Sequence, residues 1–152
     1  MTLSPILFTS ASEEWNTPPE LYASLAAHFP FTIDAAADFH NALCSYYFDQ
    51  NMDGLTQPWD GEVLFCNPPY GRKQVDWIKK AATSQATTVL LIPARTDTKV
   101  WQDVIFPFAA AIVLMRGRLT FSLGGKKKAP APFPSAIVVF GEVPGSFLTA
   151  AL

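Results

Sequence analysis

The segment Thr88–Ile92 is a continuous, mainly apolar run that stops at Pro93. Unbroken runs of this kind are typical of parallel strands that are buried on both faces of a sheet. Further strands are predicted at Glu62–Cys66, Ala110–Met115 and Ala136–Phe140, which share this apolar character. A sheet that is buried on both faces needs a covering layer on each side, so this feature constrains the fold most.

Helical patterns alternate with these strands. The first predicted helix begins at Pro18 and ends near His28, with Thr17 as its cap and Glu20 completing a Thr-x-x-Glu capping box. Two more helices are predicted at Gln74–Ser84 and Thr98–Phe106. Strands that alternate with helices indicate an α/β fold, with a mostly parallel central sheet flanked by helices.

The length of the chain, 152 residues, suits one domain that buries about two-thirds of its unfolded surface. The sequence shows no internal repeat and no segment with the composition of a domain linker. We therefore predict a single domain over 1–152, with a peripheral lead-in at 1–14 and a peripheral tail at 142–152.

Cysteine, histidine and terminal patterns exclude several classes of protein. Cys44 and Cys66 are interpreted as small buried or half-buried residues, because a chain of this length needs no disulfide support. His28 and His40 have no partners at zinc spacing, so no metal is expected. No basic segment followed by a long apolar one opens the chain, and no run reaches the ~20 apolar residues of a membrane span. These patterns predict a soluble, cytoplasmic protein with no membrane partner.

The distribution of charge is more informative than the net charge of −2. No Lys or Arg occurs in the first 62 residues, and all eleven basic residues lie from Arg72 onward. A polyanion is therefore expected to meet the second half of the chain, and a neutral or cationic small ligand the first half. The charge pattern alone equally allows an incidental asymmetry. Lys79 and Lys80 are interpreted as a solvated helix face.

The tetrapeptide Asn67-Pro68-Pro69-Tyr70 directly follows the strand Glu62–Cys66. Prolines cannot donate ladder hydrogen bonds, so they fix a rigid turn at the carboxyl end of the strand, where parallel α/β sheets bind ligands. The asparagine oxygen and a backbone carbonyl can each accept one N–H of an exocyclic amine, and the tyrosine ring can stack on the same planar group. The residues alone also fit a proline-stiffened loop with a buried tyrosine.

The predicted strand Phe31–Asp34 ends on a carboxylate, which Ala35-Ala36-Ala37 follow. A carboxylate that closes a buried strand needs a partner, because burial of an unpaired charge is costly. At this end of a strand it can accept hydrogen bonds from ribose hydroxyls or from the amino group of a ligand. A cap for the segment that follows is the alternative, and the residues leave both open.

Seven motifs follow one another between Phe8 and Phe140: Glu14–Pro18, Ile33–Ala37, Asp53–Leu55, Asn67–Arg72, Leu91–Thr98, Arg116–Leu119 and Ala131–Ser135. This series resembles the phage-type DNA N-6-adenine-methyltransferase family. Asn67–Tyr70 by itself is shared by amino-methyltransferases that act on DNA, RNA or protein glutamine. The resemblance implies a Rossmann-like methyltransferase fold, with S-adenosylmethionine as the cofactor and the N6 amine of adenine in double-stranded DNA as the acceptor. It also implies the host cell cytoplasm as the location if a phage encodes the protein.

The resemblance makes Asn67, Pro68, Pro69 and Tyr70 the catalytic motif. It implies that Asn67 and the carbonyl of Pro68 accept hydrogen bonds from the adenine amine. Tyr70 would stack on a base that has left the duplex, as chemistry on a base generally requires. No general base is needed, because the proton can leave after the amine becomes cationic. Orientation of the reactants would then supply most of the rate.

The cofactor contacts implied by the resemblance lie in the first half of the chain. The chain departs from the general methyltransferase pattern, because alanines stand where a glycine-rich turn usually follows the first strand. Trp15, Thr17 and Pro18 match the segment beside the methionine end of the cofactor. Asp34 matches the acidic position after the first strand, and Ala35 and Ala36 follow it where the glycine-rich turn usually stands. Asp53 and Leu55 match a position near the cofactor's adenine.

The chain has no inserted target-recognition domain, so its loops are expected to contact DNA. As a set, the basic residues of these loops favour phosphate contact, although each one alone is equally a surface charge or an ion-pair partner. They are Arg72, Arg95, Arg116, Arg118, Lys126, Lys127 and Lys128. Two alternatives stay open: an amino-methyltransferase acting on RNA adenine, cytosine or protein glutamine, and a DNA-binding relative that no longer methylates.

Overall fold

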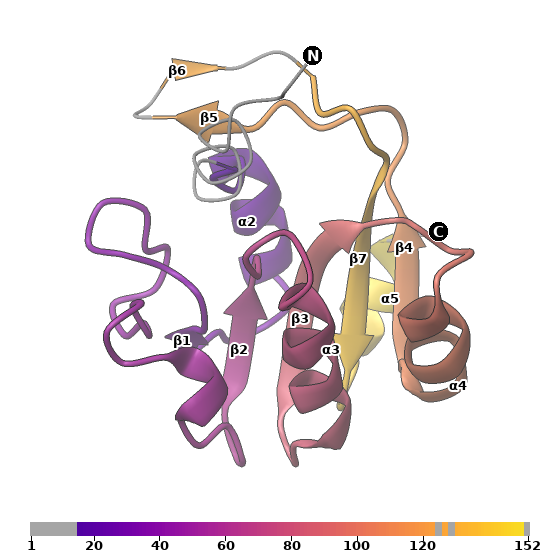
Figure 1. Ribbon diagram of the computed structural model, residues 1–152, viewed down its shortest axis with the longest axis horizontal. Coiled ribbons are helices and arrows are strands. Elements are labelled where there is room, and N and C mark those ends of the chain that lie inside the picture. The colour runs from indigo at the N-terminus through magenta and orange to yellow at the C-terminus, as the bar shows by residue number, and fades with distance from the viewer. Residues whose placement is uncertain (1–14, 124–125, 128–129, 151–152) are drawn as a thin grey trace.

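The computed structural model describes residues 15–123, 126–127 and 130–150 (Figure 1). The strands are β1 Ile33–Asp34, β2 Val63–Cys66, β3 Thr87–Pro93, β4 Ala111–Leu114, β5 Ser122–Leu123, β6 Lys126–Lys127 and β7 Ser135–Phe140. Five of them form one sheet in the order β1-β2-β3-β7-β4, while β5 and β6 form a separate antiparallel hairpin. The predicted lead-in at 1–14 lies outside the described residues.

Four strands of the main sheet, β1 to β4, run in the same direction. β2 pairs in parallel with β1 and β3, whereas β7 pairs antiparallel with both β3 and β4. The predicted α/β fold with a mostly parallel sheet is confirmed, and it is consistent with a Rossmann-like methyltransferase fold. The carboxyl ends of β1 to β4 therefore share one edge of the sheet, the upper edge in Figure 1. Open α/β sheets bind their ligands at this edge.

The helical segments lie on both faces of the sheet and connect its strands. The α-helices are α2 Pro19–Ala26, α3 Gln74–Thr83, α4 Phe106–Phe108 and α5 Gly145–Ala150. Two further helical segments are not α-helical: the 3-10 turn η1 Gly54–Thr56 is wound more tightly, and the π-helix η2 Trp101–Ile105 more widely. No helix in the described parts of the chain is long and apolar enough to cross a membrane.

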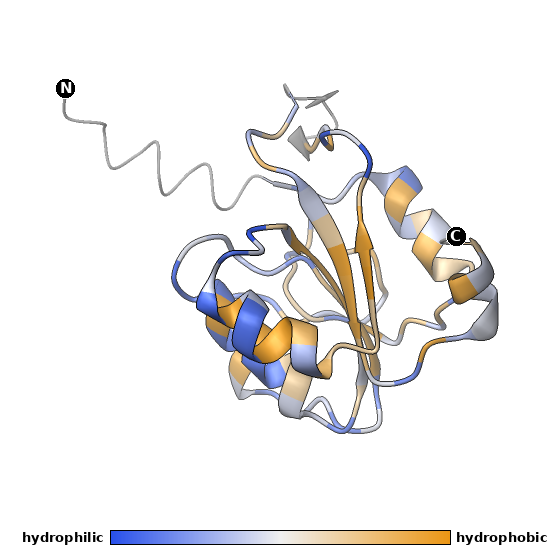
Figure 2. Ribbon diagram, turned by 90° about the vertical axis from the view of Figure 1, so that its right-hand side faces the viewer, coloured by the Kyte–Doolittle hydropathy of each residue, from blue (hydrophilic) through white to orange (hydrophobic). Residues whose placement is uncertain are grey.

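The central strands supply the core on both sides of the sheet. Leu90 and Ile92 of β3 join the apolar cluster that α3 covers, whereas Val89 and Leu91 join the cluster that α2 and α5 cover. This alternation follows from the two-residue period of a strand. Figure 2 shows the result, with mainly apolar strands lying between helical layers that carry both polar and apolar residues.

Two predicted elements differ from the structure. The strand predicted as buried at Ala110–Met115 is an edge strand, β4, in which Leu114 is 63% exposed. The helix predicted at Thr98–Phe106 is largely the π-helix η2. Pro107 explains this widening, because it cannot donate to the carbonyl four residues before it and its ring would collide with that carbonyl.

The segment predicted as a peripheral tail, 142–152, contains a packed helix, which makes that prediction wrong for its central part. α5 buries Phe147 against the sheet, and its ring centroid lies 5.0 Å from that of Phe29. The shortness of the segment hides this contact from sequence patterns, since one buried aromatic residue in a six-residue helix gives no helical period. Residues 151–152 lie outside the described part of the chain.

Candidate active site

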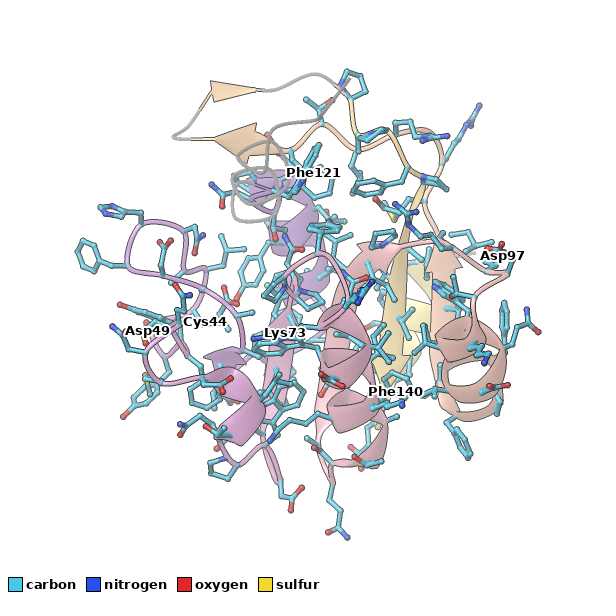
Figure 3. The ribbon with its side chains drawn as sticks, in the orientation of Figure 1. Cys44, Asp49, Lys73, Asp97, Phe121 and Phe140 are labelled. Atoms are coloured by element: carbon cyan, nitrogen blue, oxygen red, sulfur yellow. The ribbon has the colours of Figure 1, made fainter. Side chains whose placement is uncertain are left out.

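A cavity of about 620 Å³ opens at the carboxyl ends of β1 and β2. Figure 3 shows Asp49 on the loops that follow β1 and Lys73 at the start of α3, and both residues line this cavity. The motif that follows β2 lines the cavity with all four of its members, Asn67, Pro68, Pro69 and Tyr70. The predicted turn at the end of this strand is therefore in place, at the ligand-binding edge of the sheet.

The side chain of Asn67 is fixed by two hydrogen bonds from its amide nitrogen. Nδ2 donates to the backbone carbonyl of Trp15 at 2.7 Å and to the hydroxyl of Thr17 at 3.1 Å. The carbonyl of Trp15 can only accept, so the atom facing it must be the nitrogen of the amide. The other amide atom, Oδ1, is buried and has no hydrogen-bond partner among the described residues. An unpaired buried acceptor is costly, and a ligand with an N–H group would satisfy it.

Thr17 does not cap the first helix, so the predicted capping box is wrong. α2 begins at Pro19, Pro18 occupies the cap position, and no side chain there accepts a hydrogen bond. The hydroxyl of Thr17 instead receives the Asn67 amide, and Thr17 is buried and lines the cavity. A long-range contact thus outcompetes the local cap that the sequence pattern favours.

Tyr70 lies between the cavity and the apolar cluster behind it. Its ring centroid is 5.3 Å from that of Phe133 and 6.2 Å from that of Trp15. Its hydroxyl is buried without a partner among the described residues, and burial raises the pKa of Tyr70 above its ordinary value. The phenol therefore stays protonated at neutral pH, and Tyr70 offers the site a neutral aromatic surface.

Asp34 closes β1 with a buried carboxylate that lines the cavity. Its two oxygens accept hydrogen bonds from the backbone N–H of Leu43 at 3.1 Å and of Ala36 at 3.4 Å. Desolvation outweighs these two bonds and raises the pKa of Asp34 to about 6. An isolated parallel bridge joins Asp34 of β1 to Tyr47. Asp34 therefore retains acceptor capacity beside the cavity and is ionised at neutral pH.

The turn Asp53–Leu55 forms another part of the cavity wall. Asp53 has a positive φ of 53°, and its side chain accepts a hydrogen bond from the backbone N–H of Leu55 at 3.2 Å. A positive φ is uncommon for a residue with a side chain, although aspartate tolerates it better than most. Loop residues with such backbone angles often shape binding sites.

The structure brings most of the predicted cofactor residues to one cavity. Trp15, Thr17, Asp34, Ala36, Asp53 and Leu55 line it. Pro18 and Ala35 do not line the cavity. The carbonyl of Pro18 accepts hydrogen bonds from the first turn of α2, and Ala35 is fully buried with its N–H donating to Phe65.

Sequence patterns missed more than half of the lining. Most of these residues belong to the irregular segment after β1, where no period indicates which side chains turn inward. The acidic, Lys-free composition of that segment was the one available signal. The missed residues are Asn16, Ala37, Asp38, Asn41, Leu43, Phe48, Asp49, Gln50, Gly54, Phe65, Lys73, Asp76 and Trp77.

The predicted nucleic-acid residues lie outside the cavity. Arg72, Arg95, Arg116 and Arg118 are exposed, and none of their guanidinium groups has a hydrogen-bond or ion-pair partner among the residues that the structure describes. They follow β2, β3 and β4, so they occur at the same edge of the sheet as the cavity. Lys126 and Lys127 form β6 in the hairpin above this edge in Figure 1, and Lys128 lies outside the described residues.

The described residues contain no group of three or more histidine, cysteine, aspartate or glutamate side chains arranged to hold a metal ion. The five aspartates of the lining are Asp34, Asp38, Asp49, Asp53 and Asp76, against one lysine, Lys73. The cavity is therefore acidic and favours a ligand that carries positive charge.

Comparison with known proteins gives a consistent result. A DNA N-6-adenine-methyltransferase of Escherichia phage T1 is 29% identical over 120 residues, which are 76% of this chain and 50% of that protein. A DNA N-6-adenine-methyltransferase of Haemophilus phage HP1 (strain HP1c1) is 27% identical over 118 residues, which are 74% of this chain and 68% of that protein. This chain thus spans about half the length of the phage T1 relative.

The sequence profile of one family covers nearly the whole chain. The DNA N-6-adenine-methyltransferase (Dam) profile matches residues 7–144, a range that includes the motif Asn67–Tyr70, Asp34 and the turn Asp53–Leu55. The match extends over every strand of the main sheet. The chain therefore belongs to the DNA N-6-adenine-methyltransferase family.

Proposed function

We propose that this chain transfers a methyl group from S-adenosylmethionine to the exocyclic N6 amine of adenine in DNA. Membership of the family implies a methyl donor and a DNA substrate. The identity of the donor, the acceptor atom and the roles of individual residues are the proposed parts. The observation that carries the proposal is Oδ1 of Asn67, a buried acceptor without a described partner in the lining of the cavity.

The acidic lining of the cavity supports a cationic donor. S-adenosylmethionine supplies an electrophilic methyl group on a positively charged sulfonium. The carboxylate of Asp34 can accept hydrogen bonds from the donor's hydroxyl or ammonium groups, because its oxygens bind only two backbone N–H groups. Lys73, the lysine of the described lining, can pair with a carboxylate of the donor. The residues present thus fit the charges of this donor.

The turn Asn67–Tyr70 supports an amine acceptor. Oδ1 of Asn67 and the backbone carbonyl of Pro68 can each accept one N–H of the amine, and no described donor reaches the Pro68 carbonyl. With both N–H groups held in this way, the nitrogen lone pair is oriented in advance for attack on the methyl group. Positioning of this kind supplies up to ~7–11 kcal/mol of a barrier. Tyr70 offers its ring to the face of the same base.

Exposed arginines support a nucleic-acid acceptor. Arg72 directly follows the catalytic turn, and Arg95, Arg116 and Arg118 follow the neighbouring strands of the same edge. Guanidinium groups without partners in the described part of the chain are available for phosphate contacts, which position a duplex but do not specify its sequence. The acidic segment after β1 would repel a polyanion, so DNA is expected to approach from the side of β3 and β4.

Replacement of Thr17 by valine tests how the asparagine amide is held. Valine keeps the shape of threonine but removes the hydroxyl that accepts the Asn67 amide at 3.1 Å. One anchor, the Trp15 carbonyl, is left, so we expect kcat for methyl transfer to fall about tenfold. Thr17→Ser retains the acceptor and should stay within about threefold of the wild type. Steady-state kinetics decide the matter: equal rates for the valine and serine variants would contradict this role.

Radiolabelled methyl transfer to unmethylated duplex DNA, followed by nucleoside analysis, tests the function. Label in N6-methyladenine is the expected result. Label in cytosine, in RNA adenine or in protein glutamine, with none in DNA adenine, would establish the corresponding alternative instead. Binding of the donor and of DNA without transfer to any acceptor would favour a non-catalytic DNA-binding relative.

A further inference from the structure

Lys80 is a half-buried residue of α3 rather than part of a solvated face, so the interpretation of Lys79 and Lys80 as one exposed pair is wrong for Lys80. Its ammonium donates to the backbone carbonyl of Leu55 at 2.9 Å and to that of Gln57 at 2.6 Å. It also lies 5.3 Å from the ring centroid of Trp59. Lys79, its neighbour, is exposed.

The two carbonyls that Lys80 binds belong to the 3-10 turn η1 and the residue that follows it. Carbonyls at the end of a helical turn lack partners within the turn and carry a partial negative charge, which a lysine ammonium complements. The indole N–H of Trp59 donates to a third carbonyl of the same turn, that of Gly54, at 2.9 Å. Lys80 and Trp59 together therefore hold the turn by its carbonyl groups.

The turn combines local hydrogen bonds with contacts from outside it. The side chains of Asp53, Thr56 and Gln57 bond to the local backbone, yet Asp53 has an unfavourable positive φ and the 3-10 helix is only three residues long. Gly54 is packed tightly against its neighbours: a Cβ at this position would meet the carbonyl of Ala35 at 2.4 Å and the ring of Trp77 at 2.8 Å. The conformation is thus imposed in part by contacts from outside the turn.

This imposed conformation shapes the active-site cavity. Asp53, Gly54 and Leu55 line the cavity, whereas Lys80 does not. In Figure 1, α3 begins beside the turn that follows β2 and runs back along the sheet. One helix therefore carries lining residues near its start and binds the turn at Leu55 through Lys80 further along.

We infer that Lys80 is a positioning residue, which holds the wall Asp53–Leu55 in the shape that receives the methyl donor. The inference rests on the proposed function, since it takes S-adenosylmethionine as the ligand of the cavity. Lys80 acts through the backbone of the turn and touches neither donor nor base. Its loss should therefore affect affinity for the donor and leave the chemical step intact once the donor is bound.

Lys80→Met tests the inference, because methionine keeps an unbranched apolar side chain and loses the ammonium. Titration calorimetry with S-adenosylmethionine, and with S-adenosylhomocysteine as a ligand that cannot react, should show an affinity about tenfold lower for both. The value of kcat at saturating donor should change by less than about twofold. Lys80→Arg, which can still donate to both carbonyls, should recover most of the lost affinity.

Lys79→Met is the matched control for charge. Removing any lysine makes an acidic protein more negative, which by itself strengthens the binding of a cationic donor. The charge effect and the positioning effect therefore have opposite signs: Lys79→Met should bind the donor as well as the wild type or slightly better, and Lys80→Met should bind it worse.

Three results would overturn the inference. One is wild-type affinity in Lys80→Met, and another is a loss of kcat with unchanged donor affinity. If Lys80→Met does not fold, Trp59→Phe removes the indole donor to Gly54 together with part of a buried ring. Unchanged donor affinity in that variant would show that the contacts behind the turn do not set the affinity, and would also refute the inference. A wild-type protein that does not bind S-adenosylmethionine at all would refute the proposed function itself, which separates the two failures.

Discussion

Asn67→Ala is expected to abolish methyl transfer while leaving donor binding nearly intact. The substitution removes the buried oxygen that has no described partner, and with it the acceptor for one N–H of the target amine. It also removes the amide nitrogen that donates to Trp15 and Thr17, which accounts for the small loss of donor affinity that we expect. Loss of one preorganised hydrogen-bonding group at a reacting centre typically costs about 10²–10³ in kcat, and we expect at least the upper end here. Affinity for S-adenosylmethionine should stay within about threefold, since Asp34 and the turn Asp53–Leu55 are unchanged.

Single-turnover methylation of duplex DNA, paired with calorimetry of donor binding, measures the two effects separately. Asn51→Ala is the matched control, because Asn51 is an exposed asparagine that does not line the cavity. It should transfer methyl groups at the wild-type rate. A parallel loss of donor affinity and transfer in Asn67→Ala would mean that Asn67 serves the donor, and near-normal transfer would remove it from the catalytic motif.

The sheet was predictable because its signal is local. Residues of β3 and β7 are buried on both faces, so an unbroken apolar run marks each strand without reference to the rest of the chain. The position of Asn67 was predictable for a related reason. Two prolines end a strand wherever they occur, and the carboxyl end of a parallel strand faces the ligand-binding edge.

The contacts that tune the site were not predictable, because they join distant segments. Thr17 fits a helix cap by pattern, yet its hydroxyl binds Asn67, fifty residues away in sequence. Lys80 is charged and follows Lys79, a pattern typical of a solvated helix face, yet its ammonium donates to the carbonyls of Leu55 and Gln57. In both cases a hydrogen bond between distant segments replaces a local preference of comparable strength, about 1 kcal/mol. The spacing of residues along the sequence gives no sign of this replacement.

Burial of Asp34 carries a stability cost, and its proposed role in donor binding can be tested separately from that cost. The pKa of Asp34 is raised from 3.8 to about 6, so the unfolded chain ionises first as the pH rises. Between these values the folded protein holds more protons than the unfolded chain, and the contribution of Asp34 to the free energy of unfolding falls with increasing pH. At pH 8 the ionised, buried carboxylate costs of the order of 3 kcal/mol relative to an unperturbed one. Asp34→Asn removes this cost but can accept only one of the two backbone hydrogen bonds, so the variant should be about as stable as the wild type at pH 8.

The same variant should nevertheless bind the donor about 100-fold more weakly at pH 8, because it loses the charged acceptor of the donor's hydroxyl or ammonium groups. The wild-type affinity should fall as the pH is lowered through about 6, where Asp34 takes up a proton, whereas the affinity of Asp34→Asn should not follow this titration. Neighbouring Tyr22, Cys44 and Cys66 do not contribute to this titration, since burial raises the pKa of each and keeps them neutral.

Calorimetry of donor binding between pH 5 and about pH 8 provides the measurement. A wild-type affinity that does not change across pH 6, or a variant that retains the wild-type profile, would show that the donor binds without using this carboxylate. The expected pairing of undiminished stability with lost affinity separates a binding role from a structural one, because a structural carboxylate would lose both together.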